Sequence, residues 1–91
     1  MAAEIKIASV LMRFVNNESC VRCKAGKMRD ILGELGKRYP DFSKRILDEN
    51  GNLSPQIIIL VDREKVAAAN VMDTIVKDGQ EVVILSALGG G

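Results

Sequence analysis

The stretch that decides the fold closes the sequence: Lys77-Asp78-Gly79-Gln80-Glu81-Val82-Val83-Ile84-Leu85-Ser86-Ala87-Leu88-Gly89-Gly90-Gly91. Asp78-Gly79 is a strong turn signal. The apolar run that follows is rich in β-branched residues, which predicts a core strand over 81–85. Three glycines come soon after it, so a strand leads into a segment almost without side chains. We therefore predict one folded domain over residues 1–85 and a flexible C-terminal glycine tail over 86–91.

Such a tail has a specific use. Glycine lacks a Cβ and adopts extended and left-handed conformations equally well, so the tail can enter a slot too narrow for other residues. Fully extended, residues 86–91 would reach roughly 20 Å at about 3.3–3.6 Å per residue. That length would place a terminal carboxylate inside the active site of another protein. A frayed end or a cloning remnant would have the same sequence, and the tail alone leaves both interpretations open.

The middle of the chain contains a helix signal. An apolar stripe recurs at the spacing of one helical face, formed by Met28, Ile31, Leu32, Leu35 and Tyr39. We expect Gly26 to cap the start of this helix and Pro40 to end it, because the residue before proline avoids helical geometry. Asp41 is then expected to cap a short second helix with inward-pointing Phe42, Ile46 and Leu47.

Strand signals occupy both sides of the helix. Residues 4–8 alternate polar and apolar, and a second strand is expected at about 19–24, after a turn at Asn16-Asn17. The run 57–61 is wholly apolar, which predicts a central strand buried on both faces. Residues 62–65 are expected to turn into a short strand near Val66.

This order of elements predicts a fold class. Two strands, a long helix and three strands follow one another along the chain. The first and last strands can then lie side by side in the centre of a mixed sheet, with the helix covering one face. The expected architecture is an α+β two-layer sandwich.

Composition excludes several classes of function. The 13 basic and 12 acidic residues give a net charge of +1, and aromatic residues make up 3%. A nucleic-acid partner is not expected, because phosphate binding requires a basic excess and base stacking requires aromatic side chains. No apolar run approaches the roughly 18–20 residues that span a bilayer, and no signal peptide is evident. We expect a cytoplasmic protein without a membrane partner.

The sequence offers no catalytic or metal-binding set. It contains no histidine, so neither a Ser-His-Asp nor a Cys-His arrangement can form. Cys20 and Cys23 are two of the four ligands that a structural zinc site requires. On a strand, side chains three residues apart point to opposite faces, so we expect one cysteine in the core and the other on the surface.

The combination of these segments resembles a known family. The order of elements with a glycine end resembles the β-grasp fold of ubiquitin-like proteins, and more closely the MoaD/ThiS family of sulfur carriers. Residues 28–40 resemble the family helix, which ends in Tyr-Pro or a similar pair. Residues 77–85 resemble its "dGDeVailp" segment, and 86–91 stand where Pro-Ala-Val-Ala-Gly-Gly is usual. Residues 46–53 resemble a link in the larger members, and the likeness is greatest to CysO-type carriers and SAMP-type archaeal modifiers.

The resemblance implies a mixed sheet of four to five strands packed on one main helix. Five positions depart from the family pattern: Gln80 for Asp, Asp62-Arg63 for Asn-Gly, Ser86 for Pro, and Gly89 for Ala.

The resemblance implies that the chain is a protein substrate and not an enzyme. A MoeB/ThiF-type adenylating enzyme would use ATP to convert the Gly91 carboxylate into an acyl-adenylate, and sulfur would then replace AMP to leave a thiocarboxylate. The sulfur would serve cofactor or cysteine biosynthesis. The acceptor would be a molybdopterin synthase large subunit, a thiazole synthase or a cysteine synthase. ATP belongs to the activating partner, and no cofactor is expected on this chain.

The expected site is the tail. Gly91 and Gly90 are the activated C-terminus, Gly89 is a spacer, and Leu88 fixes the docking register, unless Leu88 is a core residue that continues the last strand. The alternatives are a ubiquitin-like modifier conjugated to lysines through Gly91, a small subunit of a molybdopterin synthase, and an interaction module with an inert tail. The free protein is expected to be a monomer.

Overall fold

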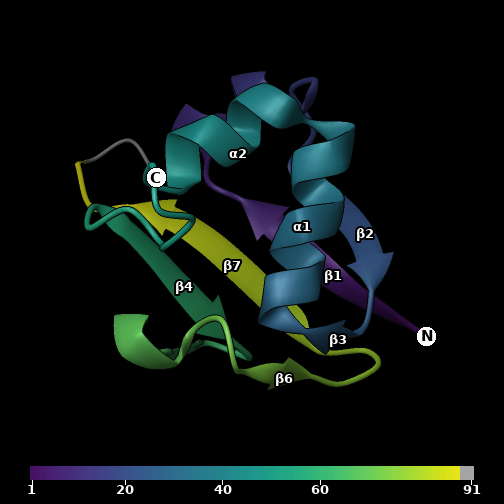
Figure 1. Cartoon of the computed structure of the whole chain (residues 1–91). Coiled ribbons are helices and arrows are strands. Elements are labelled where there is room, and N and C mark those ends of the chain that lie inside the picture. Colours follow the sequence, from purple (N-terminus) through teal and green to yellow (C-terminus); the bar gives the residue numbers. More distant parts are fainter. Residues whose placement is uncertain (89–91) are drawn as a thin grey trace.

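The computed structural model describes residues 1–88. In chain order, the elements (Figure 1) are β1 (Ala2–Ile7), the 3-10 helix η1 (Ser9–Val15), β2 (Cys20–Lys24), β3 (Gly26–Lys27), α1 (Met28–Arg38), α2 (Pro40–Ile46), β4 (Ile57–Val61), β5 (Glu64–Lys65), the 3-10 helix η2 (Ala68–Asn70), β6 (Ile75–Val76) and β7 (Glu81–Ser86).

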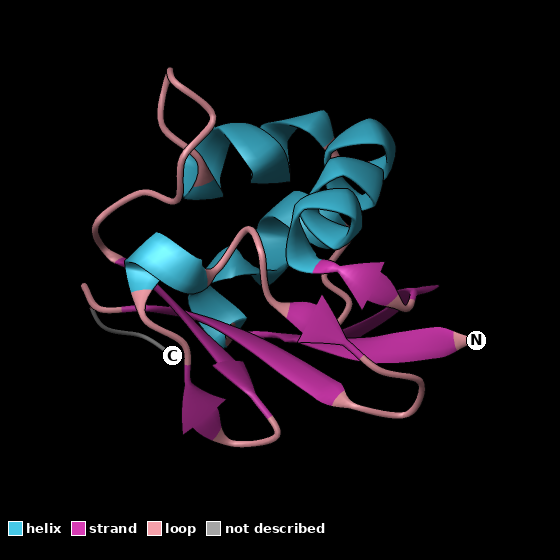
Figure 2. Cartoon of the chain, turned by 60° about the horizontal axis from the view of Figure 1, so that its bottom comes forward, coloured by secondary structure: helices cyan, strands magenta, loops and turns pink. Residues whose placement is uncertain are grey.

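A five-stranded mixed sheet forms one layer, with strand order β2-β1-β7-β4-β5. The first and last strands, β1 and β7, are parallel neighbours in its centre, as predicted, and the other pairs are antiparallel. α1 and α2 lie on one face of this sheet (Figures 1 and 2). The α+β prediction and the β-grasp architecture are therefore confirmed. A second sheet of two short strands, β3 and β6, was not predicted.

The core lies between the helices and the inner face of the sheet. Alternate strand residues such as Ile5, Val82 and Ile84 are buried there against Leu35 and Phe42 of the helices. Full burial stabilises each such side chain by about 1.5–3 kcal/mol relative to exposure. No helix within residues 1–88 is long and apolar enough to cross a bilayer.

Two predictions about helix ends are wrong. The N-cap of α1 is Lys27 and not Gly26, because the strand β3 runs through Lys27 in extended geometry and the helix begins only at Met28. Asp41 does not cap the second helix either. Pro40 ends α1 and also occupies the first turn of α2, where its missing N–H costs nothing, so the cap position falls on Tyr39.

One prediction about strands also needs correction. The run 57–61 is not buried on both faces: Ile57 and Ile59 are buried, whereas Ile58 and Leu60 are half-buried. The helices cover only the inner face, and within residues 1–88 no helix covers the outer one. In addition, η1 occupies most of the connection between β1 and β2, in which Asn16 and Asn17 are left-handed, as predicted for a turn.

Candidate functional site

The tail leaves the sheet at the end of β7. Ala87 donates its N–H to Gln56 O at 2.7 Å, which extends the pairing with β4 by one step. Leu88 donates its N–H to Ser86 Oγ at 3.3 Å, and its side chain is 81% exposed. The alternative that Leu88 continues the core is therefore wrong. Gly89, Gly90 and Gly91 lie outside the described residues, so their roles stay predictions, as does the division of the chain at residue 85.

The surface around Leu88 combines apolar and basic groups. We call it the tail-exit surface and define it as Val10, Arg45, Gln56, Ser86 and Leu88, which line a cavity of ≈ 150 Å³ together with Leu11 and Ile57. Val10 is 42% exposed. This surface brings η1, α2, β4 and β7 together at the point where the chain leaves the sheet.

Two arginines stack on one ring beside this surface. The Arg45 guanidinium lies 5.7 Å from the centroid of the Phe14 ring, and that of Arg13 lies 4.9 Å from it. Cation–π contacts of this length hold the guanidinium groups in place while leaving their donors available. The tail-exit surface therefore has a positive border that suits an acidic partner.

The outer face of the sheet carries an apolar strip. We define the outer-face strip as Ile58, Leu60, Val83 and Leu85, which are half-buried and form cross-strand pairs: Ile58 with Leu85, and Leu60 with Val83. Lys6 of β1 pairs with Glu81 at 2.9 Å along its border, and the hydrogen bond that Lys6 donates to the Glu81 carboxylate raises the pKa of Lys6. An apolar centre with a charged rim is the usual composition of a protein interface.

The two cysteines lie on opposite faces of β2, as predicted. Cys20 is exposed on the outer face and donates its thiol to Glu4 Oε2 at 3.1 Å, whereas Cys23 is 2% exposed in the core. Burial, followed by the negative charge of Glu34, raises the pKa of Cys23 to about 11. Burial and the bond to Glu4 also raise the pKa of Cys20. A raised pKa disfavours the thiolate, so neither cysteine is activated as a nucleophile.

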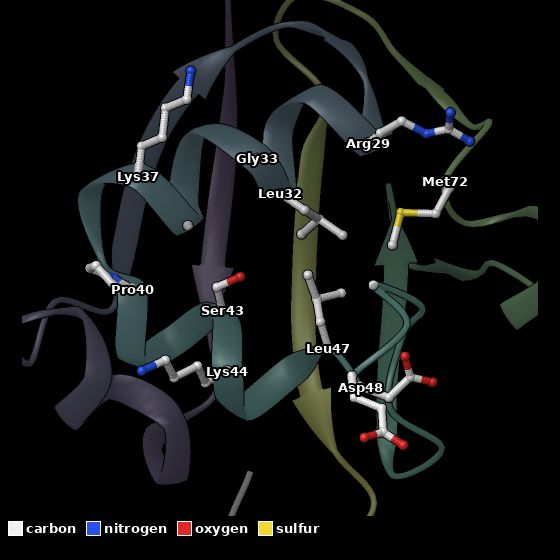
Figure 3. A pocket seen from close by; sticks show the side chains of 13 residues that line it. Arg29, Leu32, Gly33, Lys37, Pro40, Ser43, Lys44, Leu47, Asp48 and Met72 are labelled. Carbon is white, nitrogen blue, oxygen red and sulfur yellow. The ribbon is translucent and has the colours of Figure 1, made fainter.

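A separate groove lies on the helical side (Figure 3). It measures ≈ 630 Å³ between α1, α2 and the loop that follows α2, and Leu32 and Leu47 point into it toward one another. Lys37 and Lys44 stand on one side, and Asp48 lies across from them on the loop. The Ser43 hydroxyl in its lining has no histidine to activate it, since the chain contains none.

The side chains provide no catalytic constellation. Among residues 1–88 no polar or charged side chain is buried, and no group of three or more His, Cys, Asp and Glu could hold a metal ion.

Sequence reasoning missed the residues that border the tail. Val10 and Arg45 belong to η1 and α2, and only the fold brings them beside Leu88. One signal was available: Val10, Leu11, Phe14 and Val15 recur at helical spacing, which favours a turn of helix there. No pattern indicated that this turn would pack against the end of β7.

Comparisons with known proteins agree with this geometry. A family model described as "ThiS family" matches residues 5–91. The chain is 26% identical over 93 residues to the "Sulfur carrier protein CysO" of Mycobacterium tuberculosis, and the match covers 100% of both chains.

Solved structures show the same fold. The structure of the Amycolatopsis orientalis BexX/CysO complex matches with a TM-score of 0.87 at 27% identity, over 99% of this chain and 100% of that one. SAMP1 from Haloferax volcanii matches over 100% of both chains with a TM-score of 0.83 at 21% identity, which shows the fold alone.

Proposed function

The chain belongs to the ThiS family, and from that premise we propose that it is a sulfur carrier whose reacting group is the carboxyl group of Gly91. The observation that carries the proposal is the end of β7. A central core strand leads directly to an exposed Leu88, and the family match continues through the glycines to residue 91. The relative from Mycobacterium tuberculosis, matched end to end, is itself named a sulfur carrier.

The proposed activation takes place in a partner of the MoeB/ThiF type. The Gly91 carboxylate attacks the α-phosphorus of ATP and releases pyrophosphate, which gives an acyl-adenylate. A persulfide sulfur then attacks the acyl carbon, and AMP leaves with the bonding electrons. A second thiol of the donor cleaves the resulting acyl disulfide, so that the thiocarboxylate remains on Gly91 and the donor is oxidised to a disulfide.

In this scheme the folded domain acts by positioning and not by catalysis. The carboxylate must enter the partner's active site, so the domain must dock in one orientation at the mouth of that site. The outer-face strip supplies apolar area for docking, and Arg45 of the tail-exit surface supplies positive charge beside the tail, with Arg13 stacked on the same Phe14 ring. Gly90 and Gly89 then pass through the narrow entrance, with Leu88 as the first anchored side chain.

A sulfur-accepting enzyme is the second proposed partner. In Amycolatopsis orientalis CysO is found in a complex with BexX. We propose that the acceptor of this chain binds the same two surfaces after the adenylating enzyme has released the carrier. Use of the same two surfaces by two partners in turn agrees with a carrier that is a monomer when it is bound to neither partner.

The test is an intact-mass measurement. The purified chain is incubated with ATP, an adenylating enzyme of this type and a persulfide donor, and we expect a mass increase equal to the replacement of one oxygen by sulfur. Fragmentation should locate the increase at Gly91. The same spectrum of protein from its native cell establishes whether Gly91 ends the mature chain.

Two variants serve as controls. Deletion of Gly91, or addition of one residue after it, should abolish the mass increase without changing the thermal unfolding midpoint, because Leu88, the last residue that the structure describes, is already exposed. An unchanged yield of thiocarboxylate in both variants would refute the proposal. Recovery of lysine-linked conjugates without any thiocarboxylate would favour the modifier alternative instead.

A further inference from the structure

The sheet ends in a five-residue strand, β2, whose outer edge faces α1 (Figure 1). The register with β1 shows which backbone groups point to that edge. Ile7 N–H donates to Ser19 O at 2.9 Å, and Ala25 N–H donates to Met1 O at 3.2 Å. In an antiparallel pair the direction alternates from one residue to the next, so the N–H and C=O groups of Cys20, Arg22 and Lys24 point away from the sheet.

Side chains of α1 occupy two of these groups. Arg38 Nη1 donates to Arg22 O at 2.8 Å, and Lys24 N–H donates to Glu34 Oε1 at 3.1 Å. The two side chains also bind each other, with 3.3 Å between Arg38 Nη1 and Glu34 Oε2. Their spacing of i and i+4, with the acid first, is the favourable order on a helix.

The positions of these bonds matter because they are consecutive along the edge. A new antiparallel strand would bond to the backbone of Arg22 and then to that of Lys24, two residues further on. The ion pair occupies the carbonyl oxygen of Arg22 and the N–H of Lys24. An added strand could therefore not form both of its hydrogen bonds with either residue. Unpaired edges are templates for strand addition, and proteins protect them with charged groups or by covering them.

We propose that Glu34 and Arg38 form a cap that prevents a second copy of this chain from pairing with β2. The second copy is the relevant occupant, because every copy presents the same outward backbone groups of β2, and a two-fold axis through Arg22 aligns two β2 strands antiparallel. In that register Cys20 of one copy lies opposite Lys24 of the other.

The side chains of β2 add a second barrier. On that axis Arg22 faces Arg22 of the other copy, and like charges directly opposite one another destabilise a strand pair. The backbone cap and the charge therefore act together. This inference rests on the fold and not on the proposed sulfur chemistry, so the two can fail separately.

The test compares oligomeric state by sedimentation velocity over one range of concentrations. The wild type is expected to stay monomeric. The variant Glu34→Ala/Arg38→Ala should show concentration-dependent dimers, and adding Arg22→Thr should make the dimers tighter. Arg29→Ala/Asp73→Ala is the matched control, because it removes another exposed ion pair of α1, with an N–O distance of 3.4 Å, that lies away from the edge. It should remain a monomer.

A second measurement follows the cap directly. In samples dilute enough to be monomeric, amide exchange of Lys24 should accelerate by about tenfold or more in Glu34→Ala, since its charged acceptor is lost, and should stay slow in Glu34→Gln. Arg38→Gln should also form dimers. Because it is a milder change, it provides the test if Glu34→Ala/Arg38→Ala does not fold. Monomers in every folded variant that lacks Arg38, or an unchanged Lys24 exchange rate in Glu34→Ala, would overturn the proposal.

Discussion

Two glycines of α1 offer a matched test of how the surroundings decide the effect of one methyl group. Gly33 and Gly36 lie inside the helix, where glycine is about 0.8–1.0 kcal/mol less favourable than alanine. A Cβ at Gly33 would meet nothing within 4 Å, whereas a Cβ at Gly36 would lie 3.0 Å from Ser43 Oγ and 3.2 Å from Ser43 Cβ. The same substitution should therefore have different outcomes at the two positions.

Gly33→Ala should raise the free energy of unfolding by about 0.8–1.0 kcal/mol, since only helix propensity changes. For a domain of this size that corresponds to a rise in Tm of about 4–8 °C. Gly36→Ala gains the same propensity but forces α1 away from α2. The Ser43 hydroxyl can rotate aside, whereas its Cβ is fixed to the backbone. Overpacking of this kind costs typically 1–3 kcal/mol, so the net change should lie between zero and a loss of about 2 kcal/mol.

Urea unfolding followed by far-UV circular dichroism measures both variants, with equal m-values as the check on two-state behaviour. Ser43→Gly supplies the internal control, because it removes both atoms that the new methyl would meet. Combined with Gly36→Ala in a double-mutant cycle, it should show a favourable coupling of about 1 kcal/mol or more. Equal stabilisation by the two alanines, or no coupling to Ser43, would refute the reasoning.

Four further predictions concern the turn, the thiols, acid stability and docking. Arg63 has a φ of 73°, in the left-handed region that favours glycine. Arg63→Gly should stabilise the protein by about 0.5–1 kcal/mol in thermal unfolding, because relief of left-handed strain exceeds the entropy cost of glycine. A lower Tm would contradict this. Iodoacetamide should modify Cys20 and spare buried Cys23, giving one adduct by intact mass, and equal labelling of both would be inconsistent with the burial of Cys23. The Asp62 carboxylate accepts hydrogen bonds from the Glu81 N–H and the Gln80 side-chain amide, and these bonds, the first more than the second, lower the pKa of Asp62. The stability that ionised Asp62 contributes is therefore present above its ordinary pKa of 3.8 and is lost as the pH falls through the lowered pKa. In Asp62→Asn the free energy of unfolding should therefore fall less steeply below about pH 4 than in the wild type. An unchanged pH dependence in urea unfolding at acid pH would contradict this. Val83→Lys on the outer-face strip should slow thiocarboxylate formation by about tenfold or more. Ile75→Lys, at an exposed site on β6, is the control and should leave the rate unchanged. Equal rates in the two variants would show that the strip takes no part in docking.

Local patterns determined much of this protein. The stripe from Met28 to Tyr39 predicted α1 because helix spacing is a property of neighbours along the chain. The turns at Asn16-Asn17 and Asp78-Gly79 were likewise predictable, since left-handed geometry favours asparagine and glycine. The glycine end by itself left its role open, and only its resemblance to a family of sulfur carriers led to the prediction of chemistry at the C-terminus, which stays a prediction.

Tertiary structure alone decided the rest. Gly26 could not be recognised as a strand residue, because its partner Val76 lies far away in the sequence. The same holds for Val10 and Arg45, which border the tail only after η1 and α2 have packed around the end of β7. The cap formed by Glu34 and Arg38 depends on the position of α1 beside β2. Sequence periodicity reports which face of an element is apolar, whereas the packing of the elements determines which polar groups meet across the gaps between them.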